Sequence, residues 1–387
     1  MRFNQHKSSM PVFILLMASI LGLAACKLTT NGGGFTPPPG GSSERLFATS
    51  KNQLWSFSVD STTGALSGGT AITGPQLSYG VIADTARKFL YVTDSANDTV
   101  HVYSISSSGA LAELGTSPYT VGTLVGGTGA TGLAMDSAGK YLYVTDYGNS
   151  SVAGFTVNSS SGALTAMANS PFVTGALPTQ IAVDASGKFA YVADFGSGVL
   201  GGLSAFTLGS GTGVLTPVPG SSPFTTVANG GPLGVATTGQ FVFVSEQYTS
   251  NVAALTINSG TGGLSPVAGS PFAAGGEPAG TVLTPSGKYL YVANSQAGDN
   301  TISGYSVNST TGVLTPISGS PFAATVSPWY LAVDPAGKFL YATNPGVSDN
   351  TITGFTINSS TGALTQFSGA ATAVGTEPVG LTVVTLP

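Results

Sequence analysis

Lys140-Tyr-Leu-Tyr-Val-Thr-Asp146 is one of six closely similar stretches that recur along the 387-residue chain at intervals of 48 to 52 residues. The other five begin at Lys88, Lys188, Gln240, Lys288 and Lys338, and Glu44-Arg-Leu-Phe-Ala-Thr-Ser50 is a degenerate seventh copy. The copies are rich in aromatic and β-branched residues, a composition typical of a buried strand. A period of about 50 residues indicates one structural unit for each copy.

Each unit contains four strand-like stretches separated by turn signals. In the third unit they are residues 131–136, 141–145, 151–157 and 163–167. This pattern is typical of propeller blades. The first copy has no strand before it, and the C-terminal segment Pro378–Pro387 matches the strands that open other units but has no second strand after it. The sequence therefore predicts an all-β, seven-bladed propeller with four antiparallel strands per blade, whose N-terminal blade is completed by the C-terminal strand.

Most of the repeated polar residues are expected to build the scaffold. We expect the repeated lysines to be solvated turn residues, and the aspartates that open the same turns to accept hydrogen bonds from backbone amides. Those aspartates are Asp84, Asp136, Asp184 and Asp334. A repeated Ser-Pro-Phe or Ser-Pro-Tyr, as at Ser170, is expected to mark the end of an outer strand, with its aromatic ring packed between blades.

The N-terminus has the features of a secreted lipoprotein. A basic start, a short apolar run and small residues precede Cys26, the only cysteine of the chain. This indicates a signal peptide over residues 1–25, because the apolar run is short for a membrane span. Leu23-Ala24-Ala25-Cys26 resembles a bacterial lipobox, which implies a lipid on Cys26. Residues 26–43 then form a Gly- and Pro-rich tether, and the propeller spans residues 44–387.

Composition narrows the location and the partners. The formal net charge is −5, and charged residues make up 7% of the chain. This charge disfavours a nucleic-acid partner. We expect a monomer held in the cell envelope through the lipid. Lys27 stands where an aspartate would favour inner-membrane retention, so the outer membrane is favoured, with the propeller periplasmic or surface-facing.

The Tyr-Val-Thr-Asp and Tyr-Val-Ala-Asn cores and their Asp-x-x-Gly-Lys turns resemble the YVTN and lactonase-type seven-bladed propellers, which include 6-phosphogluconolactonase-like proteins. The resemblance covers residues 44–387 and implies lactone hydrolysis by histidine, arginine and glutamate at the mouth of the central channel. After the predicted signal, only His101, Arg45 and Arg87 remain of the histidines and arginines. His101 is placed on a third strand, outside the channel. The sequence therefore leans away from an enzyme.

One group of residues is a candidate binding site. Repeat position and loop order place the following on one face of the propeller: Asp94, Asp146, Asp194, Glu246, Glu277, Trp329, Tyr330 and Glu377. Acidic side chains there either cap their own turns or form an acidic mouth for a cation, a sugar or a basic peptide, with an aromatic stacking surface. No cofactor or metal site is predicted, although a bound calcium ion is compatible with such a face.

Two functions follow from these features. The lipid tether, the acidic face and the scarcity of catalytic groups favour a module that binds a small-molecule or envelope-protein ligand, or acts as a scaffold. The alternative is a lactonase-type hydrolase that opens a lactone ring in the manner of 6-phosphogluconolactonase. Its support is the resemblance of the repeats.

Overall fold

The computed structural model describes residues 44–387, apart from 125, 197–200, 221–223, 347–348 and 370. The predicted signal peptide, Cys26 and the tether over residues 26–43 lie outside the described residues. The regular structure in the described part is β-strand. None of it is a helix long and apolar enough to cross a membrane.

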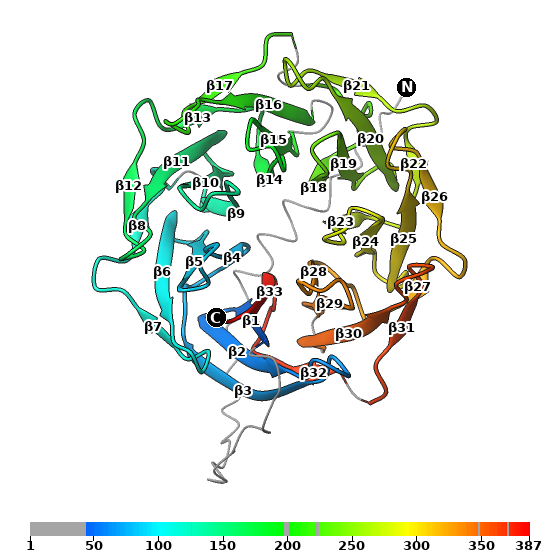
Figure 1. The fold of residues 1–387 in the computed structure, drawn as a ribbon, viewed down its shortest axis with the longest axis horizontal. Coiled ribbons are helices and arrows are strands. Elements are labelled where there is room, and N and C mark those ends of the chain that lie inside the picture. The colour runs from blue at the N-terminus through cyan, green and yellow to red at the C-terminus, as the bar shows by residue number, and fades with distance from the viewer. Residues whose placement is uncertain (1–43, 125, 197–200, 221–223, 347–348, 370) are drawn as a thin grey trace, which may run out of the picture. The chain divides into compact units, whose positions relative to one another are not determined.

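Seven antiparallel sheets stand around a ring, which confirms the seven-bladed propeller (Figure 1). The innermost strands are β33 (Leu381–Thr385), β4 (Val81–Ala83), β9 (Ala130–Met135), β14 (Pro178–Val183), β18 (Pro232–Thr237), β23 (Pro278–Leu283) and β28 (Leu331–Val333). The second strands are β1 (Glu44–Ser50), β5 (Phe89–Asp94), β10 (Tyr141–Asp146), β15 (Phe189–Asp194), β19 (Phe241–Glu246), β24 (Tyr289–Asn294) and β29 (Phe339–Asn344). In this order they define blades 1 to 7.

The outer half of each blade follows the same order. The third strands are β2 (Gln53–Val59), β6 (Thr99–Ile105), β11 (Ser151–Val157), β16 (Gly202–Leu208), β20 (Asn251–Ile257), β25 (Thr301–Val307) and β30 (Thr351–Ile357). The fourth strands are β3 (Leu66–Thr73), β7 (Leu111–Glu113), β12 (Leu164–Ala166), β17 (Leu215–Pro217), β21 (Leu264–Pro266), β26 (Leu314–Pro316) and β31 (Leu364–Gln366). Five blades add a two-residue strand at the outer edge: β8 (Tyr119–Thr120), β13 (Phe172–Val173), β22 (Phe272–Ala273), β27 (Phe322–Ala323) and β32 (Thr372–Ala373).

Both ends of the described chain build blade 1, as predicted. The C-terminal strand β33 pairs antiparallel with the N-terminal strand β1, with Glu44 opposite Thr385 and Ala48 opposite Leu381. The N-terminal part supplies the three outer strands of this blade and the C-terminal part supplies the innermost one. Closure therefore uses ordinary strand pairing, which leaves no open edge between the ends.

The Ser-Pro motif divides the outer strand of a blade into two halves, a feature that the four-strand prediction did not include. In blade 3, β12 pairs with one end of β11 and β13 pairs with the other. Between them, Ser170 Oγ accepts a hydrogen bond of 2.9 Å from the amide of Gly154. The hydroxyl thus replaces a backbone acceptor at the break, and Phe172 is buried between blades as expected.

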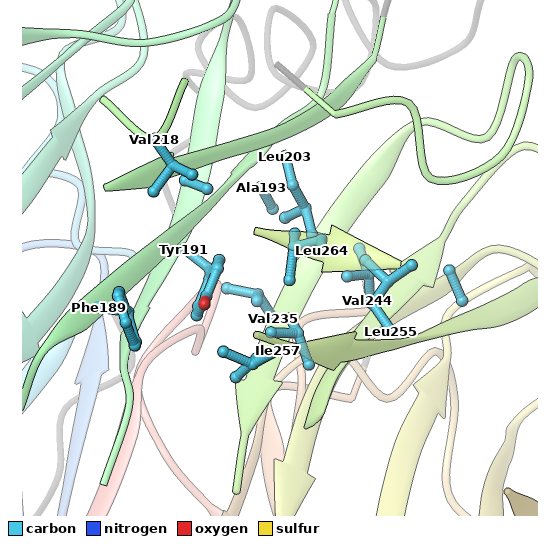
Figure 2. Packing of buried hydrophobic residues seen from close by; sticks show 13 residues of the cluster. Phe189, Tyr191, Ala193, Leu203, Val218, Val235, Val244, Leu255, Ile257 and Leu264 are labelled. Carbon is cyan, nitrogen blue, oxygen red and sulfur yellow. The ribbon is translucent and has the colours of Figure 1, made fainter. Parts of the chain in front are cut away.

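The hydrophobic core consists of separate clusters between neighbouring blades. Figure 2 shows the cluster between blades 4 and 5, in which Tyr191 and Leu203 pack with Val244 and Leu255. Comparable clusters lie between the other pairs of adjacent blades. The second strands are buried almost throughout. This double-sided burial explains why their sequences are continuously apolar rather than alternating.

In five of the seven blades, the repeated tyrosine ties the blade to the next one. Its hydroxyl donates to the carbonyl of a turn glycine in the neighbouring blade at 2.6 to 3.2 Å. The pairs are Tyr91–Gly162, Tyr143–Gly213, Tyr191–Gly262, Tyr291–Gly362 and Tyr341–Gly64. In blade 1, where phenylalanine replaces the tyrosine, Ser56 Oγ donates to the carbonyl of Gly109 instead.

The repeated threonine links the innermost strands around the channel. Thr145 Oγ1 accepts from the amide of Gly132 in its own blade and donates to the carbonyl of Thr179 in the next. Thr93, Ser245, Thr343 and Thr49 make the same pair of contacts. A hydroxyl is needed here because it both accepts and donates.

The predicted turns on the far side of the blades are confirmed. Asp136 Oδ1 accepts from the amides of Lys140 and Tyr141, both at 2.7 Å. Asp84, Asp184 and Asp334 bind the corresponding amides of their own turns. The lysines that follow these aspartates are exposed.

Candidate functional site

We use the term mouth face for the side that carries the loops from second to third strands and the loops that enter the innermost strands. A repeated backbone bond holds these two sets of loops together. The residue after a second strand donates its amide to the entering loop, as Tyr147 does to Gly129, Phe195 to Leu177 and Ser295 to Glu277. The side chains at these positions differ between blades. The backbone of the mouth face is therefore regular, whereas the chemical groups that it presents change from blade to blade.

A glutamate and a lysine meet where the ring closes. Lys51 Nζ lies 3.7 Å from Glu377 Oε1, and the two side chains are 34% and 23% exposed. Glu377 is held at a positive φ of 53°, and Asn350 Oδ1 accepts its amide at 2.9 Å. The other carboxylate oxygen, Oε2, is buried and has no hydrogen-bond partner among the described residues. The pair therefore offers an acceptor and a cation side by side.

Three tyrosines of the mouth face, Tyr79, Tyr147 and Tyr248, extend the candidate site beyond the Lys51–Glu377 pair. Burial raises the pKa of Tyr79 to about 12, and the nearby charge of Glu377 adds to this rise in pKa. Burial likewise raises the pKa of Tyr147 to about 12, with Tyr248 as a smaller cause. Glu277 contributes in the same way to the raised pKa of Tyr248. The charge of Glu377 is thus felt at Tyr79 and that of Glu277 at Tyr248, and the raised pKa keeps each tyrosine hydroxyl protonated as a donor.

Aromatic rings add apolar surface to the mouth face. The rings of Phe195 and Tyr248 are tilted against each other with centroids 5.1 Å apart, and Tyr248 is 38% exposed. Trp329 and Tyr330, both predicted, are half-buried at the entrance of blade 7. Their backbones are fixed, because Trp329 donates to the carbonyl of Thr343 and Tyr330 to its hydroxyl. Such rings suit the apolar faces of a small ring compound.

The four acidic residues predicted at the ends of second strands lie beneath the mouth face. Asp94 and Asp146 are at most 2% exposed, and Asp194 and Glu246 are fully buried. Asp94 accepts the amides of Gln76 and Leu77 in the entering loop. Asp146 accepts the amide and side chain of Asn149. Asp94 and Asp146 thus hold the loops, as the turn-capping interpretation expected, and their role towards a ligand stays a prediction.

Asp194 and Glu246 are more isolated. Burial raises the pKa of Asp194 to about 7, against the opposing effect of a 2.6 Å bond from Ser204 Oγ. Burial raises the pKa of Glu246 to about 8. Neither oxygen of Glu246 has a hydrogen-bond partner among the residues that the structure describes. A weak interaction with Thr226 opposes the rise in its pKa. Both groups favour the protonated form because ionisation in a buried site is costly.

His101 lies on β6, outside the channel as predicted, but it has close partners. Its Nδ1 is 2.6 Å from Glu113 Oε1 and its Nε2 is 3.8 Å from Asp94 Oδ2. The imidazole thus bridges an outer-strand carboxylate and a loop-holding carboxylate. Both of these contacts lie within blade 2.

The described residues offer little for a metal or a phosphate. They contain no group of three or more His, Cys, Asp or Glu side chains placed to hold a metal ion. Arg45 donates to Ser58, and Arg87 follows a turn on the face opposite the mouth. Lys51 is the one cation that the described chain places on the mouth face.

Comparison with known proteins places this scaffold in a family. The family model for lactonases with a seven-bladed β-propeller matches residues 80–227 and 216–323, more than half of the chain. The chain belongs to the lactonase family of seven-bladed β-propellers. Family membership supports the lactonase alternative better than the scaffold function that the sequence favoured. A search of curated protein sequences found no match.

Solved structures share the fold of this lactonase-family chain. The periplasmic gluconolactonase of Pseudomonas aeruginosa superposes with a TM-score of 0.73 at 18% identity, over 89% of this chain and 99% of that one. A candidate 6-phosphogluconolactonase of Bacteroides fragilis gives a TM-score of 0.72 at 20% identity, over 90% and 99%. A Lactobacillus plantarum protein gives 0.69 at 20% identity, over 88% and 99%. At these identities the likeness concerns the fold.

Sequence reasoning missed Lys51, Tyr147 and Tyr248 as site residues. Lys51 and Tyr147 directly follow the repeated Ser, Asp or Asn that ends a second strand, and Tyr248 follows one position later. Across the seven copies this position reads Lys51, Ser95, Tyr147, Phe195, Gln247, Ser295 and Pro345. The sequence could have indicated these site residues, because this position varies between the copies of an otherwise regular repeat.

Proposed function

We propose that the mouth of this propeller binds an uncharged sugar lactone and opens its ring by hydrolysis. The observation that carries this proposal is the partly exposed Lys51–Glu377 pair, whose carboxylate is near enough to Tyr79 to contribute to the raised pKa of that hydroxyl. Family membership supplies the reaction class. The pair supplies the two groups that lactone hydrolysis requires, a base for water and a positive charge for the developing oxyanion.

The reaction follows from the positions of these groups. Glu377 accepts a proton from a water molecule, which attacks the lactone carbonyl carbon. The carbonyl oxygen becomes an oxyanion, stabilised by the ammonium of Lys51 and by the hydroxyl of Tyr79, which burial keeps protonated. The bond from the carbonyl carbon to the ring oxygen then breaks, and the leaving oxygen takes the proton back from Glu377. The product is an open hydroxy acid.

The charges of the mouth face favour a substrate without a phosphate. A phosphorylated lactone needs further cationic groups at the phosphate, and Lys51, which the proposed reaction uses at the carbonyl, is the one cation of the described residues on this face. Glu277 adds negative charge on the same face, and like charges repel a bound phosphate. The aromatic residues Tyr147, Tyr248 and Trp329 instead suit the apolar faces of a sugar ring.

A pair of matched variants tests the proposal. Ring opening of glucono-δ-lactone is followed by pH-stat for the wild-type chain, Glu377→Gln and Glu277→Gln. Removing a general base costs roughly 10²- to 10⁴-fold in kcat, so Glu377→Gln should lose at least about 100-fold. Glu277 occupies the same repeat position in blade 6, but serine replaces the lysine beside it. Glu277→Gln should therefore raise KM and leave kcat within roughly threefold, because no base is removed.

Two results would reject this assignment. If the wild-type chain does not accelerate δ-lactone hydrolysis, the protein is not a lactonase of this kind. If it binds the lactone tightly without turnover, the protein acts as a binding module. Equal loss of kcat in both variants would show that Glu377 has no special role. A higher kcat/KM for a 6-phosphorylated lactone than for the unphosphorylated one would overturn the substrate class.

We also propose that a lipid on Cys26 holds the protein in the cell envelope, at the outer membrane. The lipobox-like Leu23-Ala24-Ala25-Cys26 supports this location. Radiolabelled palmitate should enter the wild-type chain and not the Cys26→Ala variant. Equal labelling of the two chains, or none of the wild type, would contradict the proposal.

A further inference from the structure

Exposed lysines gather on the face opposite the mouth. In each of five blades, the turn from the first to the second strand ends on a lysine, directly before the buried second strand. These residues are Lys88, Lys140, Lys188, Lys288 and Lys338, and all are exposed. We call this side the lysine face. Arg87, also exposed, adds to it.

The distribution of cations between the two faces is strongly uneven. The described residues contain eight lysines and arginines, and seven of them lie at the lysine face, including the half-buried Arg45 at the start of β1. The eighth, Lys51, lies at the mouth and is paired with Glu377. A chain with a net charge of −5 thus carries most of the cations of its described residues on one face.

The acidic residues on the same face do not cancel this charge at the surface. Asp84, Asp136, Asp184 and Asp334 are between 1% and 7% exposed. Their oxygens accept backbone amides within their turns. Glu44 is also buried, at 6% exposure, which leaves Asp60 as the exposed acid among the described residues of this face. The exposed charges of this face are therefore mainly those of the lysines, of which Lys288 also lies with its Nζ 5.0 Å from the centroid of the Tyr289 ring.

The chain enters the propeller on the lysine face. Strand β1 begins at Glu44, which pairs with Thr385, and ends at Ser50 on the mouth face, where Lys51 begins the next loop. The described chain therefore starts at the lysine face and reaches the mouth face at the end of its first strand.

We propose that the lysine face docks on an anionic lipid surface and turns the mouth away from the membrane. Lysines placed around a ring contact a flat anionic surface together, and each lysine near such a surface strengthens binding by roughly fivefold. The attraction falls off within about 10 Å at 0.1 M salt. A lipid on Cys26 would add a membrane affinity of its own, whereas the choice of face rests on the charge distribution of the described residues.

A ratio of partition coefficients isolates the contribution of charge. The full chain is partitioned between buffer and vesicles of phosphatidylcholine, and between buffer and vesicles that also contain phosphatidylglycerol. Any lipid or apolar anchor contributes to both values and cancels in their ratio. We expect the wild-type ratio to favour anionic vesicles by at least about tenfold at low salt and to approach unity near 0.5 M salt.

Variants then assign the effect to the lysine face. Replacing Lys88, Lys140, Lys188, Lys288 and Lys338 together by glutamine should bring the ratio to unity or below, whereas Lys51→Gln should leave it unchanged. The substituted side chains are exposed, and unfolding curves confirm that the variant remains folded. A wild-type ratio near unity at low salt, or a ratio unaffected by the five substitutions, would overturn the proposal.

Amine labelling reports the orientation directly. On anionic vesicles, acetylation of the five lysines should slow severalfold relative to phosphatidylcholine vesicles, while Lys51 labels at the same rate on both. Slower labelling of Lys51 would place the mouth against the membrane and refute the proposal. Binding of a soluble polyanion such as heparin, without preference for anionic vesicles, would assign the face to an acidic partner instead.

Discussion

Removing the hydroxyl of Tyr341 tests how the ring is held closed. This hydroxyl donates at 2.7 Å to the carbonyl of Gly64, and so joins blade 7 to blade 1. Tyr341 is fully buried, and Gly64 is buried too. In the Tyr341→Phe variant the carbonyl therefore loses its partner where water cannot replace it.

The expected loss of unfolding free energy is about 1 to 3 kcal/mol, the cost of leaving a buried acceptor unsatisfied. Urea unfolding gives this value from the shift in midpoint, provided that the slope is unchanged. Tyr191→Phe is the matched control, because Tyr191 makes the same bond at 3.0 Å inside the ring. Phe243 occupies this position in blade 5, so Phe243→Tyr is the reverse substitution.

Equal losses for Tyr341→Phe and Tyr191→Phe would show that the closing interface resembles the others. Losses below about 0.5 kcal/mol for both would refute the reasoning, because the net value of a buried hydrogen bond would then be negligible. A far larger loss for Tyr341→Phe would contradict the equivalence of the interfaces and identify closure as the weakest point of the ring.

Two further perturbations follow from particular contacts. Burial raises the pKa of Glu246 from 4.5 to about 8, so the native state holds a proton that the unfolded chain releases, and stability falls as pH rises across that window. The Glu246→Gln substitution should thus be more stabilising at pH 9 than at pH 5, by on the order of 2 to 4 kcal/mol in the free energy of unfolding measured with urea. If the unfolding free energies of the two chains change in parallel with pH, the raised pKa is contradicted. Gly162 has a φ of 73°, and a Cβ there would lie 2.6 Å from the ring of Phe89, whereas Gly211 has a φ of 74° and open space. In calorimetric melting, Gly211→Ala should lower the free energy of unfolding by about 1 kcal/mol. Gly162→Ala should lower it by at least about 2 kcal/mol more, because Phe89 must also shift. Similar losses for the two variants would show that the Phe89 ring moves freely.

The architecture could be predicted because one short repeat carries most of its contacts. In Tyr-Val-Thr-Asp, the tyrosine bonds the next blade, the threonine links the innermost strands and the aspartate holds the loops. Each residue type recurs because each blade needs the same kinds of hydrogen bond to its neighbour and to its loops. The division of the outer strand was not predicted, since it depends on a serine hydroxyl that replaces a backbone group, as at Ser170.

The candidate site was harder to predict than the fold. Whether an acidic side chain is buried depends on how the loops pack over it, and the repeat pattern does not show this. Asp94 stands at the end of a strand, as a mouth residue should, but the entering loop folds over it and occupies its oxygens. Glu377 occupies a comparable loop, but its Oε1 lies 3.7 Å from Lys51 Nζ instead. The sequence pattern assigns both residues to one face, and only the packing separates a carboxylate that holds a loop from one that pairs with a lysine.

The position of the Lys51–Glu377 pair follows from how the ring closes. Lys51 comes directly after β1, near the start of the described chain, and Glu377 comes shortly before β33, near its end. Blade 1 is the degenerate copy of the repeat, since Ser50 stands where the other blades have an acid or an amide. The pair that we propose for catalysis therefore forms only when the ring is closed, so loss of closure should remove activity even while the other blades stay folded.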